Sequence, residues 1–369
     1  MRWIFVGLLT VHGLIHIIGF ANAFGLGEFP QLAQPISKTV GVGWLLAGIL
    51  TLAAAAALWA APRVWWVAAF GAVVVSQGVI FTSWSDAKAG TVANAMLLAA
   101  AVYGFAAQGP LSFRAAYRRA VTDRLTSPPS PELVAEADLK ALPDPVQRYL
   151  RFAGSVGQPR VHHVMARWRG RIRAAPGDPW MPFTAQQYNF PAEPARFFLM
   201  DARKRGLPVD VFHAFRSGGA GMTVRLLSLV PLVESTGPEF DRAETVTLLN
   251  DLALLAPAAL IDPAIRWEPV DSSTARVRYT VGPNTIAAVL RFGNGGELVD
   301  FVSDDRSMTS PDGSRLTQVR WSTPVAAYRS FAGRRAATLG EGRWHLPSGE
   351  FVYIELELVD LEINGAGPG

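Results

Sequence analysis

The sequence contains no cysteine, and that absence excludes several kinds of chemistry. A chain without thiols forms no disulfide, binds no iron–sulfur cluster, holds no zinc ion through cysteine and uses no thiol as a nucleophile. Lysine is scarce as well, because only four of the 34 basic residues are lysine and the others are arginine. This skew, together with abundant alanine and glycine, is typical of a GC-rich bacterial genome.

Charged residues are also scarce, at 17% of the chain against about a quarter in soluble domains. The shortage lies in residues 1–109, which hold four basic and two acidic side chains; the other 30 basic and 28 acidic residues fall in 110–369. The pattern predicts a membrane domain over 1–109 and a nearly neutral soluble domain after it. A net charge of +4 is too small to indicate nucleic-acid binding.

Four apolar runs occupy the first third of the chain, at about 3–24, 40–61, 64–82 and 91–108. As helices of roughly 18–22 residues they would measure about 27–33 Å, which matches the hydrocarbon core of a bilayer. They predict a four-helix transmembrane bundle. The first run is too long for a cleavable signal peptide.

The basic residues predict the orientation of this bundle. With four spans, Arg2, Arg63 and the arginines of 114–124 all fall on one side, whereas the loops 25–39 and 83–90 carry one lysine and one acid each. Cytoplasmic loops are the ones enriched in lysine and arginine. We therefore expect a multi-pass protein of the bacterial inner membrane, with both termini and the C-terminal domain in the cytoplasm.

Two histidines in the first span are the polar residues to explain within the bundle. His12 and His16 are four residues apart and so share one helix face. Three interpretations stay open: neutral imidazoles hydrogen-bonded to carbonyls or to Ser76, Gln77 or Asn94; ligand or proton binding; or a metal site. The first is favoured, because no acid or cysteine on another span would complete a metal shell.

Charged segments flank the fourth span. Asp86 and Lys88 precede it, either as a polar lid over the bundle or, as we favour, as ordinary helix-start chemistry with an acid near a helix N-terminus. Arg114, Arg118 and Arg119 follow it in an amphipathic segment suited to contact anionic lipid headgroups. Residues 110–131, which end in a proline-rich stretch, are predicted to be the exit and linker to a soluble domain over 132–369.

The soluble domain is predicted to be α+β. Short helices are expected at 131–141 and from Pro143, after which the hydrophobic period changes to the alternation of strands. About ten strands are expected, at 164–173, 184–190, 196–202, 209–216, 222–229, 276–281, 286–292, 298–304, 315–322 and 351–363. A long helix is expected from Arg242 to Leu255. An antiparallel sheet of this size curls, so the prediction is a half-barrel wrapped around one or two helices, either hollow or filled.

Several stretches resemble an uncharacterised bacterial membrane-protein family, in which a four-helix membrane module is fused to a C-terminal domain of unknown function. They are HGLIHIIGF at 12–20, WSDAKAGT at 84–91, LPDPVQRY at 142–149, PWMPFT at 179–184, Trp267 and WSTP at 321–324. The resemblance covers most of the chain but implies no activity. The layout of a sheet around a helix is similar in outline to lipoprotein-carrier half-barrels, as an analogy of fold only.

Sequence motifs for catalysis are absent. The chain has no phosphate-binding G-x-x-x-x-G-K-[ST], no G-x-G-x-x-G between strand and helix, no G-x-S-x-G and no H-E-x-x-H. His162 and His163 are adjacent on a predicted strand and so point to opposite faces. His213 and His345 stand alone in sequence, and for each a structural role is favoured. No cofactor and no metal site is predicted.

The long helix holds the better candidates for a site. Glu244 and Asp251 are seven residues apart and share a face, with Asn250 beside them. The favoured interpretation is a solvated or salt-bridged helix face; if the helix lines a cavity, these groups would orient a polar ligand head. The alternating arginines at 167, 169, 171 and 173 either meet phosphate headgroups or, as we favour, pair across strands with acids such as Glu355 and Glu357.

Three functional hypotheses follow. The first is a non-catalytic module that binds a hydrophobic or lipid-like small molecule, with the lipid bilayer as its other partner. The alternatives are a membrane-associated enzyme with a carboxylate site on the long helix, and a scaffold for proteins at the membrane surface. The expected ligand-binding residues are Glu244, Leu249, Asn250, Asp251, Trp267 and Phe301.

Overall fold

A computed structural model describes residues 2–27, 29–30, 32–125, 131–217, 219–310 and 313–367, so most of the proline-rich stretch before 132 lies outside the described residues. The chain divides into two compact units, Met1–Ala116 and Tyr117–Gly369. The sheet unit is the one that carries the candidate site.

The first unit is helical. Four helices are long and apolar enough to cross a membrane: α1 (Arg2–Ala23), α2 (Lys38–Ala60), α3 (Trp65–Thr82) and α5 (Gly90–Gln108), with the short α4 (Trp84–Ala87) before α5. Small residues let the helices approach closely: a Cβ added to Gly48 would lie 3.0 Å from the carbonyl oxygen of Gly13. Large apolar side chains such as Val74 and Val92 face outward. Helices that are apolar all round suit a lipid environment.

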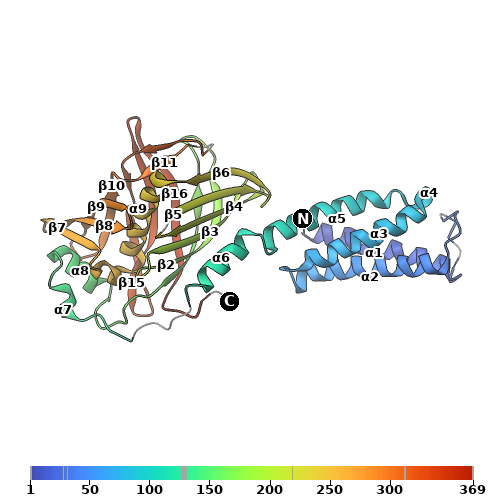
Figure 1. The fold of residues 1–369 in the computed structure, drawn as a ribbon, viewed down its shortest axis with the longest axis horizontal. Coiled ribbons are helices and arrows are strands. Elements are labelled where there is room, and N and C mark those ends of the chain that lie inside the picture. The colour runs from blue at the N-terminus through green and yellow to red at the C-terminus, as the bar shows by residue number, and fades with distance from the viewer. Residues whose placement is uncertain are drawn as a thin grey trace. The chain divides into compact units, whose positions relative to one another are not determined.

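The second unit is built on a 14-stranded antiparallel sheet (Figure 1). Its order is β6-β5-β4-β3-β2-β1-β16-β15-β13-β10-β9-β8-β7, with β14 also paired to β15. The first seven strands in chain order are β1 (Val164–Ile172), β2 (Met181–Phe190), β3 (Ala195–Lys204), β4 (Leu207–Arg216), β5 (Gly219–Leu226), β6 (Val230–Thr236) and β7 (Ile265–Asp271). The others are β8 (Thr274–Val281), β9 (Asn284–Phe292), β10 (Leu298–Ser303), β13 (Trp321–Ser322), β14 (Val325–Phe331), β15 (Arg334–Leu346) and β16 (Gly349–Ile363), while β11 (Ser307–Thr309) and β12 (Leu316–Gln318) form a separate ribbon.

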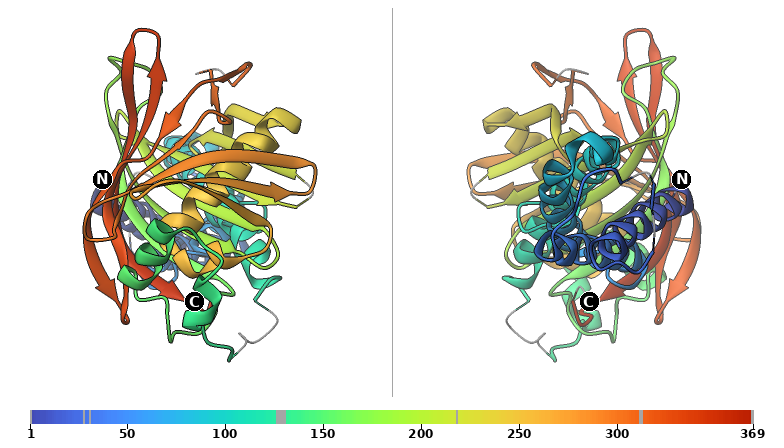
Figure 2. Two further views of the ribbon diagram at one scale, coloured as in Figure 1. Left: turned by 90° about the vertical axis from the view of Figure 1, so that its left-hand side faces the viewer. Right: turned by 90° about the vertical axis from the view of Figure 1, so that its right-hand side faces the viewer.

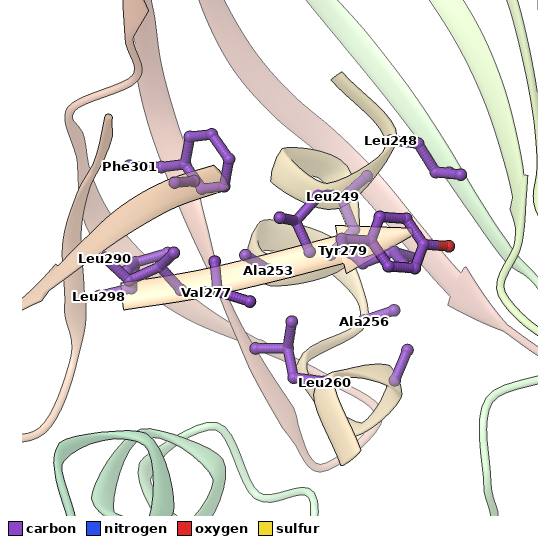
Figure 3. Packing of buried hydrophobic residues seen from close by; sticks show 14 of the residues in the cluster. Leu248, Leu249, Ala253, Ala256, Leu260, Val277, Tyr279, Leu290, Leu298 and Phe301 are labelled. Carbon is purple, nitrogen blue, oxygen red and sulfur yellow. The ribbon is translucent and has the colours of Figure 1, made fainter. Parts of the chain in front are cut away.

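The sheet curves around one long helix, α9 (Pro238–Leu255), as the two side views show (Figure 2). The helix is buried on nearly all sides, which explains its weak amphipathicity. Its apolar side packs in a continuous core against β8, β9 and β10, where Leu249, Val277, Leu290 and Phe301 meet (Figure 3). The predicted half-barrel around a helix is therefore confirmed, and the side of α9 that faces β8–β10 is filled.

Smaller helices complete the unit. They are α6 (Phe113–Thr122), α7 (Glu136–Leu139), α8 (Asp144–Phe152) and the 3-10 helix η1 (Pro257–Ile261). From Tyr117 onward α6 lies on the outer face of the sheet, where Tyr117 contacts Tyr188 and Phe212. Pro143 is the N-cap of α8, and Asp144 lies in its first turn.

The expectation of about ten strands is too low. It misses β6, β7, β11, β14 and β15, and it joins β12 and β13 into one strand. In β14 and in β6 most side chains are partly or fully exposed on both faces, so no clean apolar alternation marks them. In β15, glycines at 340 and 342 interrupt the pattern. Strands that are held mainly by backbone hydrogen bonds, and that do not bury one face, lack the alternation of apolar and polar residues from which strands are predicted.

Candidate functional site

The pairing register sets which side chains share the inner face of the sheet. Along β1, Trp168 and Ile172 face α9, whereas Arg169 and Arg171 face solvent and pair with Glu357 and Glu355. Nε of Arg171 lies 2.6 Å from Oε2 of Glu355. The predicted pairing across strands is therefore confirmed for Arg167, Arg169 and Arg171, whereas Arg173 donates to the carbonyl of Val352 and stacks on Trp180.

A cavity of about 320 Å³ lies between the sheet and the side of α9 that faces away from the filled core. Its volume is at the lower end of the range of small-molecule sites, about 300–1,000 Å³. Most of its wall is apolar, from residues that include Trp168, Ile172, Phe198, Met200, Met222, Val224, Val233, Phe240, Met308, Trp344, Phe351 and Ile354. Exposed residues at its edge, among them Ala174 and Leu339, place part of the wall at the surface.

One buried arginine joins the two carboxylates of α9. Arg196, on β3, places Nε 2.6 Å from Oδ2 of Asp251 and a terminal nitrogen 3.4 Å from Oε2 of Glu244. All three side chains line the cavity and are at most 10% exposed. Breaking a buried pair by removing one partner typically costs about 3–5 kcal/mol, because it leaves an uncompensated charge.

Asp251 is held by further donors from β2. Its Oδ2 accepts hydrogen bonds from the side-chain amides of Gln187, at 2.7 Å, and Asn189, at 3.1 Å. These residues face inward because Asn189 and Arg196 are direct partners in the β2–β3 register. Burial raises the pKa of Asp251 although the charge of Arg196 opposes it. Its oxygen Oδ2 is thus occupied by protein donors.

Glu244 has a different electrostatic environment. Nδ1 of His213 lies 3.5 Å from its Oε2, and a terminal nitrogen of Arg306 lies 3.9 Å from its Oε1. Burial alone would raise the pKa of Glu244, but His213 and the guanidinium groups of Arg196 and Arg306 outweigh it and lower the pKa to about 2. Burial lowers the pKa of His213, so this imidazole is neutral at pH 7.

Two donors at the cavity wall lack a hydrogen bond within the described residues. They are Nε of Arg306 and Nε1 of Trp321. The guanidinium carbon of Arg306 lies 4.4 Å from the ring centre of Trp321 and 5.5 Å from that of Trp344, so stacking holds it in place. Buried polar groups are normally satisfied, and a ligand carrying acceptor atoms would satisfy these.

The structure separates the expected ligand-binding residues into two groups. Glu244, Asn250 and Asp251 line the cavity, and Oδ1 of Asn250 accepts a hydrogen bond from Thr323 at 2.6 Å. Leu249 and Phe301 instead lie in the filled core with no exposed surface, and Trp267 packs against that core and donates to the carbonyl of Leu260. The expectation that these three side chains line a cavity needs correction, because they belong to the opposite side of α9 from the hollow.

Sequence reasoning missed the residues that complete the polar cluster. Arg196 appears in the sequence only as the first residue of an expected strand, His213 as a lone histidine and Arg306 as a turn residue. The available signal is positional, because Arg196 and His213 fall on the inward phase of strands whose other inward residues are apolar. A charged residue at such a position needs a buried partner.

In the helical unit, His12 and His16 take part in a buried polar cluster. Nε2 of His12 lies 3.0 Å from Oδ1 of Asn94, and Nε2 of His16 lies 2.8 Å from the hydroxyl of Ser76. These are contacts of the kind that the favoured interpretation expects, and Asn94 in turn donates to Gln77. Among the described residues no group of three or more histidine, aspartate or glutamate side chains could hold a metal ion.

The other charged residues singled out in the sequence lie on α4, just after it, and on α6. Asp86 lies in the first turn of the short helix α4, which directly precedes α5, and it accepts a hydrogen bond from the backbone amide of Gln34. Lys88 follows α4 as its C-cap. On α6, Arg114 donates to the carbonyl of Ala107, Arg118 is half-buried and Arg119 is exposed. Their contact with lipid headgroups stays a prediction.

The sheet domain is thus a half-barrel with an apolar cavity and a buried charged end. Residues 132–356 match a family of unknown function (DUF6544), which spans more than half of the chain, so the chain belongs to that family. The four apolar helices lie outside the matched range. No curated protein matches the chain.

Several solved structures are similar to part of the chain. One is described as an outer membrane lipoprotein-sorting protein domain from Vibrio parahaemolyticus, with 11% identity, a TM-score of 0.33 and coverage of 55% of this chain and 85% of that one. Others are a LolA superfamily protein from Nitrosomonas europaea (14% identity, TM-score 0.33, 60% and 94% covered) and a DUF1329 family protein from Desulfovibrio piger (14%, 0.33, 63% and 94%). At these TM-scores the likeness carries no conclusion about the function of this chain.

Proposed function

We propose that the sheet domain binds an amphipathic, lipid-like small molecule, and that the four apolar helices anchor it in the bacterial inner membrane. One observation carries the proposal: a cavity of about 320 Å³ whose wall is largely apolar and whose charged groups gather on α9 and the strands beside it. Sites for small molecules combine an apolar wall with a few placed polar groups.

The chemistry of the wall orients the ligand. An alkyl tail fits against Phe198, Met200 and Val224, since burial of apolar surface drives such binding. A head with acceptor atoms, such as a carboxylate or phosphate, fits beside Arg306 and Trp321, whose unpartnered donors lack a protein acceptor. The carboxylates of Glu244 and Asp251 disfavour an anion placed nearer to them.

Blocking the cavity tests this proposal. We expect Val224→Trp to lower photo-crosslinking of a diazirine-labelled fatty acid to the full chain in nanodiscs at least several-fold, because the indole fills the space along β5. Peptide mapping should place the crosslinks of the unaltered chain on cavity-lining strands. The matched control is Thr223→Trp, whose side chain lies on the opposite face of the same strand and outside the cavity wall.

Equal crosslinking in Val224→Trp, Thr223→Trp and the unaltered chain would contradict the proposal. So would crosslinks confined to the four apolar helices. Hydrogen exchange of the sheet amides, measured on each variant, separates a blocked cavity from a domain that has failed to fold.

A second candidate is an enzyme that acts on the same bound molecule. The observation that favours it is that Glu244 and Asp251, whose pKa values are shifted in opposite directions, both line the cavity. Asp251→Asn distinguishes the two functions. If the protein is an enzyme, the unaltered chain releases a converted ligand, whereas Asp251→Asn releases the ligand unconverted. If it is a binding protein, the mass of the extracted ligand is the same with and without the substitution.

A further inference from the structure

Exposed apolar side chains gather at two neighbouring hairpin turns of the sheet domain. Leu207 is 47% exposed at the β3–β4 turn, and Leu229, Val230 and Leu232, at 47%, 52% and 40%, lie at the β5–β6 turn. The backbone amide of Leu227 donates to the carbonyl of Pro208 at 2.9 Å, so the two turns lie side by side. We call this surface the tip patch. Single exposed leucines are ordinary, but a contiguous group marks an interaction surface.

Cations flank the apolar residues of the tip patch. Arg203, Lys204 and Arg205 precede Leu207 and are all exposed, and Arg203 also donates to the carbonyl of Gly206. Of the acids close by in sequence, the buried Asp210 accepts from Ser228, and Glu234 lies farther along β6. An apolar tip beside clustered lysine and arginine is the composition that binds anionic bilayer surfaces.

The backbone of the β5–β6 turn adds an independent observation. Leu227 and Ser228 have φ angles of 53° and 59°, and the amide of Leu229 donates to the carbonyl of Leu226 at 3.1 Å. Glycine and asparagine are the usual residues at consecutive positive φ angles. A leucine there is strained, and strained residues cluster at functional sites.

We infer that the tip patch docks on an anionic lipid bilayer. The inference goes beyond ligand binding and rests on the proposal that α1, α2, α3 and α5 hold this domain beside a membrane. The leucines insert among the lipid chains at the interface, while Arg203, Lys204 and Arg205 contact lipid phosphates. Strands β4 and β5, which lead from these turns, also carry cavity residues such as Val224, so docking brings that side of the half-barrel to the lipid.

The absence of cysteine allows a direct test on the full chain. Leu229→Cys, labelled with an environment-sensitive fluorophore, reports on the tip patch, and Ser217→Cys, exposed at the far end of β4, is its matched control. Both proteins are reconstituted in vesicles of phosphatidylcholine alone or mixed with phosphatidylglycerol, with nitroxide-labelled lipids as quenchers. We expect quenching at position 229 in the anionic vesicles several-fold above that at position 217.

Charge removal provides the second measurement. The triple variant Arg203→Gln, Lys204→Gln, Arg205→Gln, carrying the label at position 229, should weaken docking by about fivefold for each charge removed, and added salt should act in the same direction. Equal quenching at 229 and 217, or no dependence on phosphatidylglycerol, would overturn the inference. The label at position 229 could instead become more buried in neutral vesicles as the number of protein molecules per vesicle increases. That result would indicate self-association and would also overturn the inference.

These outcomes are separable from failure of the proposed function. Fatty-acid crosslinking in the cavity depends on Val224 and its neighbours and does not require the tip patch. A chain that crosslinks normally but shows no quenching at position 229 binds a ligand without docking through these turns. A chain that docks but does not crosslink retains the docking surface and loses the ligand proposal.

Discussion

At the scale of single residues, Arg196 determines the character of the cavity. It pairs with two buried carboxylates, Asp251 and Glu244, and Gln187 and Asn189 complete the donors to Asp251. Glu244 shares this arginine but also meets His213 and Arg306. Because buried ion pairs contribute little net stability, their presence on a cavity wall favours a role in orienting a ligand.

The lowered pKa of Glu244 predicts how stability depends on pH. A carboxyl with a folded-state pKa of about 2 and an ordinary value of 4.5 contributes stability that is fully present above 4.5 and is lost as the pH falls toward 2. The contribution is of order 3 kcal/mol, at 1.36 kcal/mol for each pKa unit. Glu244→Gln should therefore flatten the loss of stability between pH 4.5 and 2.

Hydrogen exchange of the α9 and β3 amides across this pH range measures the effect. The matched control is Glu239→Gln, in the first turn of the same helix, whose carboxylate is outside the cavity wall. Parallel pH profiles for Glu244→Gln and the unaltered chain would contradict the assignment.

At the scale of elements, α9 has two sides with separate tasks. Leu249 and Ala253 pack in the filled core, while Glu244, Thr247 and Asn250 line the cavity. The helix therefore holds the half-barrel together on one side and borders the cavity on the other. The sequence predicts the helix itself but not this division, because both sides are buried and the hydrophobic pattern around it is weak.

Truncating one core leucine of α9 and one exposed leucine of the tip patch tests whether Leu249 lies in the filled core. Leu249→Ala should lower the free energy of unfolding by about 2–5 kcal/mol, the usual cost of a large-to-small change in a packed core. Leu232→Ala, on the exposed tip patch, should stay within about 0.5 kcal/mol. Urea unfolding of the full chain in detergent, followed by sheet-amide exchange, gives both values, and equal losses would show that the core has been misplaced.

At the scale of the whole molecule, the proposed membrane anchor implies an orientation for the sheet domain. Basic residues gather before the first apolar helix, between the second and third, and after the fourth. With four spans these segments lie on the same side, and the excess of basic residues there predicts a cytoplasmic sheet domain. The loop that contains Ala33 would then face the opposite compartment. This orientation also places the tip patch at a leaflet whose anionic lipids give it a negative surface potential.

Single cysteines in the cysteine-free chain determine the orientation. In spheroplasts, Ala33→Cys should react with a membrane-impermeant maleimide, whereas Ser217→Cys should react only after the membrane is permeabilised. The reverse pattern would place the sheet domain outside the cytoplasm. Reaction of both cysteines in intact spheroplasts would mean that the span count is wrong.

The sequence alone determined the features that depend on local pattern. The apolar runs predict the four helices, and alternation along β1 predicts its apolar inner face and its ion pairs with β16. The run from Arg242 to Leu255 predicts most of α9, which begins earlier, at Pro238. These are contacts within one helix, one strand or one pair of strands, and hydrophobic period and charge sign are sufficient to predict them.

Only the tertiary structure decided where the cavity lies and which side chains complete it. Arg196 contacts Asp251, which lies 55 positions later in the sequence. Arg306, in the turn after β10, contacts Glu244 on α9. Such contacts depend on the curvature of 14 strands and on the rotation of α9 within them, and neither leaves a local signal. Leu249 and Asn250 are neighbours in sequence, yet one lies in the core and the other at the cavity, because successive residues of a helix point about 100° apart.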